Sequence, residues 1–269
     1  MSVIAAAPSG DLRVAQVRAF VAILRRDVYV TGKELPVFLA QVILQPLFLL
    51  LVFGKVLGAL GYTAPGYADL LFPGLLSLTA VLTGIQTLAF PLVIEFGWTK
   101  EIEDRLLAPM ATGLVAAEKL LFATARGIIA AAVMIPVGIL ILGHIPWRWS
   151  GFPLLLAALV LGSLLGASLG LVMGTLVTPQ RINMVFSLVF TPLLFTGATQ
   201  YPWPTLSRLE WFKIVTACNP MTYVSEAMRG ALVPQVPHIA PWICLVVLVG
   251  ANTVLIWIGT RGFYRRAID

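Results

Sequence analysis

The sequence predicts an all-helical polytopic membrane protein with six transmembrane helices. Of its 269 residues, 59% are hydrophobic and only 11% are charged, whereas a soluble domain carries about 25% charged residues. The mean hydropathy is +0.94, and the apolar residues come in long blocks, which indicates that lipid is the solvent. The charges are too few to cover a water-facing surface.

Six apolar stretches are long enough, or nearly long enough, to cross the hydrocarbon core, which takes about 20 helical residues. They are residues 36–57, 70–94, 120–142, 152–177, 182–197 and 239–259. The fifth stretch is the shortest and contains Pro192. We expect residues 1–269 to form a single transmembrane domain.

The basic residues predict the orientation of these spans. An even number of spans puts both termini on one side, and 13 of the 18 Lys and Arg residues fall on that side. The positive-inside rule makes that side cytosolic. The N-terminus has neither the basic start nor the long apolar core of a signal peptide, so we expect it to stay in the cytosol.

Residues 11–33 predict a helix that precedes the first span. One face of this helix is apolar and carries Val14, Val17, Val21, Leu24 and Val28. The pattern favours an amphipathic helix lying in the inner membrane interface. A soluble helix packed on another subunit is the alternative.

The inner loop between the second and third spans, residues 98–109, predicts a short helix with two different sides. Thr99 suits its N-cap, Glu101 and Arg105 are spaced to pair across one turn, and Pro109 ends it. Its acidic side holds Glu101, Glu103 and Asp104, and its apolar side holds Trp98, Ile102 and Leu106. The pattern fits a docking surface for a cytosolic partner and a solvated linking helix equally well.

Small residues recur at every fourth position of the fourth span. The series is Ala158, Gly162, Gly166, Gly170 and Gly174. Glycine at this spacing lets two helix backbones approach closely in lipid. We expect this glycine ladder to pack within the chain, and a subunit interface is the alternative.

Polar side chains within the first two spans suggest a substrate path. They are Gln41, Gln45, Thr79, Thr83 and Gln86. Intramembrane polar groups tend to face the bundle interior or a cavity, but hydrogen bonds between helices explain them equally well. We find no acidic residue deep in a span, which argues against a proton- or sodium-coupled carrier.

The outer segment 201–233 is too polar to span the membrane and too apolar for a free loop. It predicts two short helices broken at Asn219-Pro220, with Asn219 as cap and Pro220 in the first turn. Glu226 and Arg229 are three residues apart and suited to pair. We expect a re-entrant hairpin in the outer leaflet, with an amphipathic segment on the outer surface as the alternative.

The sequence shows no sign of catalytic or metal chemistry of its own. It has no G-x-x-x-x-G-K-[ST] pattern for binding ATP and no H-E-x-x-H pattern for zinc. Its two histidines have no ligand-like neighbours, and the two cysteines are too few for a metal cluster. We therefore expect no catalytic residue, no metal site and no nucleic-acid partner. An ion-coupled secondary transporter is the alternative function, and a membrane enzyme or scaffold is a third.

Two local patterns resemble those of the ABC-2 family of ATP-binding-cassette permeases, the membrane subunits of bacterial exporters. Thr99, Glu101, Leu106 and Pro109 resemble an inner-loop pattern in which Gly-Thr and Glu precede Leu and Pro. The outer segment resembles the family's Asn-Pro-x-Thr-Tyr signature, through Asn219, Pro220, Thr222, Tyr223, Glu226, Ala227 and Arg229. The order of elements is similar along nearly the whole chain. One departure is that Trp98 stands where the family has glycine, with Gly97 one position earlier.

The resemblance implies an assembly and roles for both patterns. The chain is most similar to nodulation lipo-oligosaccharide and daunorubicin-resistance permeases of the bacterial plasma (inner) membrane. Two permease subunits, identical or different, would assemble with two cytosolic ATPase subunits, which bind ATP and Mg while this chain binds no cofactor. Residues 98–109 would be the coupling helix, through Trp98, Thr99, Glu101, Ile102, Glu103, Arg105, Leu106 and Pro109. The outer gate would comprise Asn219, Pro220, Thr222, Tyr223, Glu226 and Arg229. The resemblance also implies that the exported substrate is amphipathic and lipid-like, drug-like or a glycan.

Overall fold

The computed structural model describes residues 9–99 and 111–268, and the regular secondary structure in these ranges is entirely helical. The long helices are α1 (Ser9–Leu49), α3 (Tyr67–Ile94), α5 (Thr112–Leu142), α6 (Phe152–Leu176) and α10 (Pro241–Ile268). The shorter ones are α2 (Leu57–Ala59), α7 (Ile182–Thr196), α8 (Glu210–Ala217) and α9 (Pro220–Leu232). The π-helical segments η1 (Leu50–Val56) and η2 (Glu95–Thr99) continue α1 and α3, and the 3-10 segments η3 (Trp149–Gly151) and η4 (Trp203–Arg208) precede α6 and α8.

Five helices in the described ranges are long and apolar enough to cross a membrane. They are Ala40–Ala59, Tyr67–Gly97, Thr112–Leu142, Trp149–Leu176 and Pro241–Ala267. The remaining predicted span is α7, which has 15 residues. At 1.5 Å per residue it is about 22 Å long, short of the ~30 Å hydrocarbon core. The structure therefore supports a polytopic membrane protein, and α7 as a sixth span stays a prediction.

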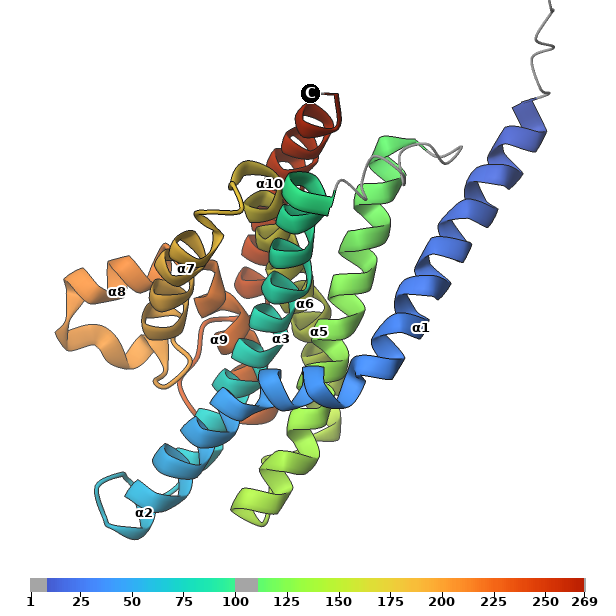
Figure 1. Cartoon of the computed structure of the whole chain (residues 1–269). Helices are drawn as coiled ribbons and strands as arrows, with labels where there is room; N and C mark the ends of the chain where they lie inside the picture. The colour runs from blue at the N-terminus through green and yellow to red at the C-terminus, as the bar shows by residue number, and fades with distance from the viewer. Residues whose placement is uncertain (1–8, 100–110, 269) are drawn as a thin grey trace, which may run out of the picture.

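The helix expected at residues 11–33 is not separate from the first span. Helix α1 runs without a break from Ser9 to Leu49, through Pro36 and Pro46, and passes directly into η1. A proline inside a helix removes one backbone donor and crowds the preceding turn, so it bends the helix. Figure 1 shows the ribbon of α1 changing direction between its dark-blue first part and its lighter second part.

Two other helices are longer than the predicted spans. Helix α5 starts at Thr112 and not near residue 120, and α10 continues to Ile268 and not to 259. Hydropathy marks only the part of a helix that is apolar enough to lie in the hydrocarbon core, while the helix itself continues into more polar sequence. The extension brings Glu118 into the second turn of α5, where its side chain is fully buried.

Helices α3 and α6 form the centre of the fold. Every residue of α3 from Leu71 to Ile85 is buried, as expected for a helix covered on all sides. The glycine ladder of α6 allows this contact, because a Cβ on Gly166 would lie 2.0 Å from the Val81 carbonyl oxygen. Built Cβ atoms on the other three glycines meet residues of the same chain: Val224 for Gly162, Ile85 and Leu88 for Gly170, and Leu92 for Gly174. The described ladder therefore packs within the chain.

The two ends of the described chain lie at the same end of the helix bundle. Figure 1 shows the start of α1 and the end of α10 there, together with the end of α3, the start of α5 and the connection from α6 to α7. The opposite end carries α2 and the connection from α5 to α6. This arrangement groups the segments that the sequence assigns to the inner side.

Candidate functional site

Helix α9 begins at a cap that also binds it to α7. The Asn219 side-chain oxygen accepts a hydrogen bond from Met221 N at 2.9 Å, and Pro220 occupies the first turn, where its missing N–H is not needed. The Asn219 amide nitrogen donates to Thr196 Oγ1 at 2.9 Å and to the Pro192 carbonyl oxygen at 3.2 Å. The predicted helix break at Asn219-Pro220 and its cap are confirmed.

The next two polar residues of α9 hold it against α8. Thr222 Oγ1 donates to the Thr216 carbonyl oxygen at 2.6 Å, and the Tyr223 hydroxyl donates to the Ala217 carbonyl oxygen at 2.9 Å. Both acceptors are in the last turn of α8, where carbonyl groups lack a partner within their own helix. These two side chains therefore fix the angle between the short helices.

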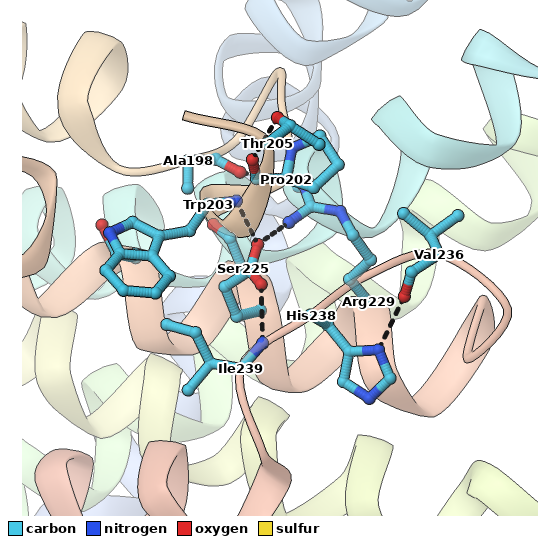
Figure 2. A network of polar contacts seen from close by, with 12 residues as sticks. Ala198, Pro202, Trp203, Thr205, Ser225, Arg229, Val236, His238 and Ile239 are labelled. Atoms are coloured by element: carbon cyan, nitrogen blue, oxygen red, sulfur yellow. Dashed lines mark hydrogen bonds and ion pairs between the residues drawn. The ribbon is translucent and has the colours of Figure 1, made fainter. Parts of the chain in front are cut away.

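Two charged residues of α9 form a buried network, which we call the α9 clasp. Glu226 and Arg229 have no exposed side-chain surface, and they form the ion pair that their spacing predicts. Glu226 Oε1 also accepts from Trp203 N, and Oε2 accepts from Ile239 N, each at 3.0 Å. Arg229 Nη2 donates to the Ala198 carbonyl oxygen at 2.9 Å. Figure 2 shows Trp203, Arg229 and Ile239 grouped around this network, with dashed lines marking its hydrogen bonds.

The clasp joins α9 to three connecting segments: the loop after α7, the start of η4 and the loop before α10. Burial lowers the pKa of Arg229, and the neighbouring Glu226 carboxylate raises it. Because an arginine guanidinium stays protonated in proteins, the clasp is an ion pair. Ala198 adopts a left-handed conformation with φ of 51°, which is costly for a residue with a Cβ, and the bond from Arg229 stabilises it.

A second polar feature lies between α1, α3 and α5, and we call it the α1–α3–α5 cavity. Its volume is about 680 Å³, within the range of about 300–1,000 Å³ for ligand pockets. Its polar wall residues are Gln41, Gln86, Thr87, Glu95, Thr99 and Arg126, and its apolar ones are Phe38, Phe90, Pro91 and Ile94. The cavity thus brings together two of the predicted path residues, Gln41 and Gln86, from different helices.

The other predicted path residues lie elsewhere. Gln45, one turn further along α1, lines a neighbouring groove. Thr79 donates to the Leu75 carbonyl oxygen of its own helix at 2.8 Å. Thr79 and Thr83 are both buried, and neither lines the cavity wall.

The charged residues of this region were not predicted as site residues. The Arg126 guanidinium carbon lies 3.7 Å from the centroid of the Phe38 ring. Toward the start of α5, Lys119 Nζ pairs with the Glu95 carboxylate at 2.8 Å, with side chains only 7% and 12% exposed. A charge inside an apolar run is the signal that points to such residues. Arg126 and Lys119 are among the 13 basic residues from which the orientation was predicted.

Most of the predicted coupling residues lie outside the described residues. These are Glu101, Ile102, Glu103, Arg105, Leu106 and Pro109. Trp98 and Thr99 are the last two residues of η2, which continues α3 beyond Ile94. Helix α3 therefore leads into this segment through continuous helical backbone.

Among the described residues, no group of three or more His, Cys, Asp or Glu side chains is placed to hold a metal ion.

The comparisons with known proteins decide the family. A family model described as ABC-2 type transporter matches residues 18–233, which is most of the chain. This chain belongs to the ABC-2 type transporter family. A search of curated proteins gave no match.

An ABC-2 permease is a membrane-embedded transport component without a catalytic site of its own, and the family generally associates with an ABC ATPase. The matched range contains the α1–α3–α5 cavity and both charged residues of the α9 clasp. It ends at Val233, before α10 begins.

Proposed function

We propose that this ABC-2 permease is the transmembrane subunit of an ATP-driven exporter. It moves an amphipathic lipid-like, drug-like or glycan substrate from the cytosol or inner leaflet outward. The observation that carries the proposal is the family match across residues 18–233. The α1–α3–α5 cavity supports it, because a wall of amide, hydroxyl and aromatic groups suits a molecule with polar and apolar parts.

The proposed setting is the bacterial plasma membrane, with both termini in the cytosol. Two arguments support this orientation: 13 of the 18 basic residues fall on the side assigned to the termini, and both described ends lie at one end of the bundle (Figure 1). The partners are two cytosolic ATPase subunits, which hold ATP and Mg, and a second permease subunit, identical or different.

Residues 98–109 are proposed as the coupling helix on the basis of the resemblance. The ATPases would move this segment when they close on ATP. Because η2 continues α3 directly, such a movement would act on a helix that lines the cavity and packs against α6 and α9. The clasp would keep α9 and its connecting segments together as an outer gate while α3 shifts.

The deciding experiment is purification of the tagged chain from its native membrane in mild detergent, scored for a co-purifying P-loop ATPase. We expect an ATPase to accompany the wild type. Glu101→Ala and Arg105→Ala should abolish ATP-dependent transport while insertion stays normal. Glu210→Ala, which removes an exposed carboxylate from α8, is the matched control and should behave as wild type.

Two results contradict the proposal at different levels. Absence of any ATPase, under conditions in which the permease stays folded, overturns the exporter function. Normal transport by both coupling variants overturns the role of residues 98–109 and leaves the exporter function standing.

A further inference from the structure

The wall of the α1–α3–α5 cavity is chemically divided. Phe38, Phe90 and Ile94 supply apolar surface, while Gln41 and Gln86 supply amide groups that donate and accept hydrogen bonds. A purely polar solute is not the ligand that best fits this cavity, because such a solute would leave the aromatic surface without contacts. A hydrocarbon is equally disfavoured, because it would leave the amides without partners.

An apolar groove adjoins this cavity and shares Gln41 with it. The groove has a volume of about 450 Å³. The rest of its wall is Leu44, Gln45, Phe48, Leu49, Val52 and Phe53, all on α1 and η1. Because Gln41 lines both, the groove adjoins the cavity, and its apolar residues follow the polar wall along α1.

Arg126 gives the polar part a positive charge well inside a transmembrane helix. It lies 14 residues after Thr112, the first residue of α5, about 21 Å along the helix axis. Its guanidinium lies over the face of Phe38, which orients it at the cavity wall. A guanidinium matches the geometry of phosphate and carboxylate groups and binds them more strongly than neutral donors do.

Two further observations favour a ligand in this position. Thr87 is 7% exposed and lines the cavity, and its Oγ1 has no hydrogen-bond partner within the described part of the chain. A buried hydroxyl without a partner is costly, and a ligand oxygen would satisfy it. Glu95 also lines the cavity, but its carboxylate pairs with Lys119 at 2.8 Å, so its charge is balanced within the protein.

We propose that the α1–α3–α5 cavity and the adjoining groove bind an acyl-chain amphiphile with an anionic headgroup. The headgroup contacts Arg126, Gln86 and Thr87, and the chain passes Gln41 and lies along Phe48 in the groove. This inference deepens the proposed function, because it adds the charge and the orientation of the ligand. Its binding test needs no ATPase, so it can fail or succeed independently of the exporter proposal.

The test uses the purified chain in detergent and phosphatidylglycerol with a photoactivatable diazirine at the end of one acyl chain. After illumination, peptide mass spectrometry locates the label. Wild type should be labelled within the groove, at residues 44–53, and phosphatidylcholine with the same chains should label it far less. Arg126→Gln should lower labelling by phosphatidylglycerol about tenfold, as expected for a lost charge-assisted hydrogen bond.

Two variants separate loss of binding from loss of folding. Arg126→Lys retains the charge and should retain most of the preference for phosphatidylglycerol. Arg181→Gln removes an exposed arginine from the connection between α6 and α7 and should be labelled as wild type. Equal labelling by the two lipids, or unchanged labelling of Arg126→Gln, would overturn the proposal. Complete displacement by soluble glycerol 3-phosphate would also overturn it, because the chain would then contribute nothing.

Resident membrane lipid and transported cargo share this chemistry. Proteoliposomes that contain the permease with its ATPase distinguish them once the site is established. Labelling that falls during ATP hydrolysis identifies the bound amphiphile as cargo. Labelling that persists identifies it as a resident lipid, and both results require the proposed site.

Discussion

Replacing Glu226 by alanine would remove the centre of the α9 clasp. Three groups lose their acceptor: the Arg229 guanidinium, Trp203 N and Ile239 N. Breaking a fully buried ion pair costs about 3–5 kcal/mol. Trp203 N and Ile239 N form partly buried hydrogen bonds, so each adds about 1 kcal/mol when left without a partner, the lower end of the range of about 1–3 kcal/mol for a buried donor. Even the lower ends of these ranges lower the free energy of unfolding by about 5 kcal/mol.

The assay is thermal unfolding of the detergent-solubilised chain, followed by the fraction that remains monodisperse after heating. At about 2–4 °C per kcal/mol for a chain of this size, we expect Glu226→Ala to lower the midpoint by about 10–20 °C. Glu226→Gln keeps one acceptor oxygen and should fall between wild type and Glu226→Ala. Glu210→Ala, with an exposed carboxylate on α8, controls for loss of a negative charge. A midpoint of Glu226→Ala equal to that of Glu210→Ala would refute the reasoning.

Three other substitutions test the packing and the remaining polar contacts by the same assay. Gly166→Ala places a Cβ 2.0 Å from a backbone carbonyl oxygen of α3, whereas the Cβ of Gly250→Ala meets nothing within 4 Å. We expect Gly166→Ala to lower the free energy of unfolding by about 1–3 kcal/mol and Gly250→Ala not to lower it. Equal midpoints for the two variants would contradict backbone contact between α3 and α6. Asn219→Ala removes the cap of α9 and should cost about 0.5–2 kcal/mol, with a midpoint unchanged from wild type counting against the cap. Lys119→Met leaves the Glu95 carboxylate without its partner at 2.8 Å and should lower the midpoint. A Glu95→Lys, Lys119→Glu double variant exchanges the two charges and should recover much of that loss. If the double variant recovers nothing, the pair is not the stabilising contact.

The sequence by itself determined the membrane class and the break in the outer segment. Low charge content and long apolar runs are properties of composition, and they leave lipid as the only solvent that suits the chain. The cap at Asn219 and the pairing of Glu226 with Arg229 were also predictable, because both depend on residues close in sequence along one helix. The same local logic found the glycine ladder of α6.

Local pattern was a poorer guide wherever a helix continues past its apolar part. The periodicity of residues 11–33 and the proline at position 36 predicted two helices, but the backbone continues as α1 and bends. Similarly, hydropathy placed the start of the third span near residue 120, eight residues after α5 begins at Thr112. Hydropathy identifies the residues that are apolar enough for the hydrocarbon core, and helical hydrogen bonding does not stop where those residues end.

Only the tertiary structure decided which distant residues meet. Gln41 and Gln86 share a cavity with Arg126 because α1, α3 and α5 pack together, and no spacing along the chain records that. The clasp carboxylate accepts hydrogen bonds from the backbone N–H groups of Trp203 and Ile239. Because nearly every residue carries a backbone N–H, the sequence does not indicate which of them bind the carboxylate. The sequence thus determined the elements and their local contacts, while the cavity and the clasp were decided by long-range packing, which depends on how whole helices fit and not on their individual patterns.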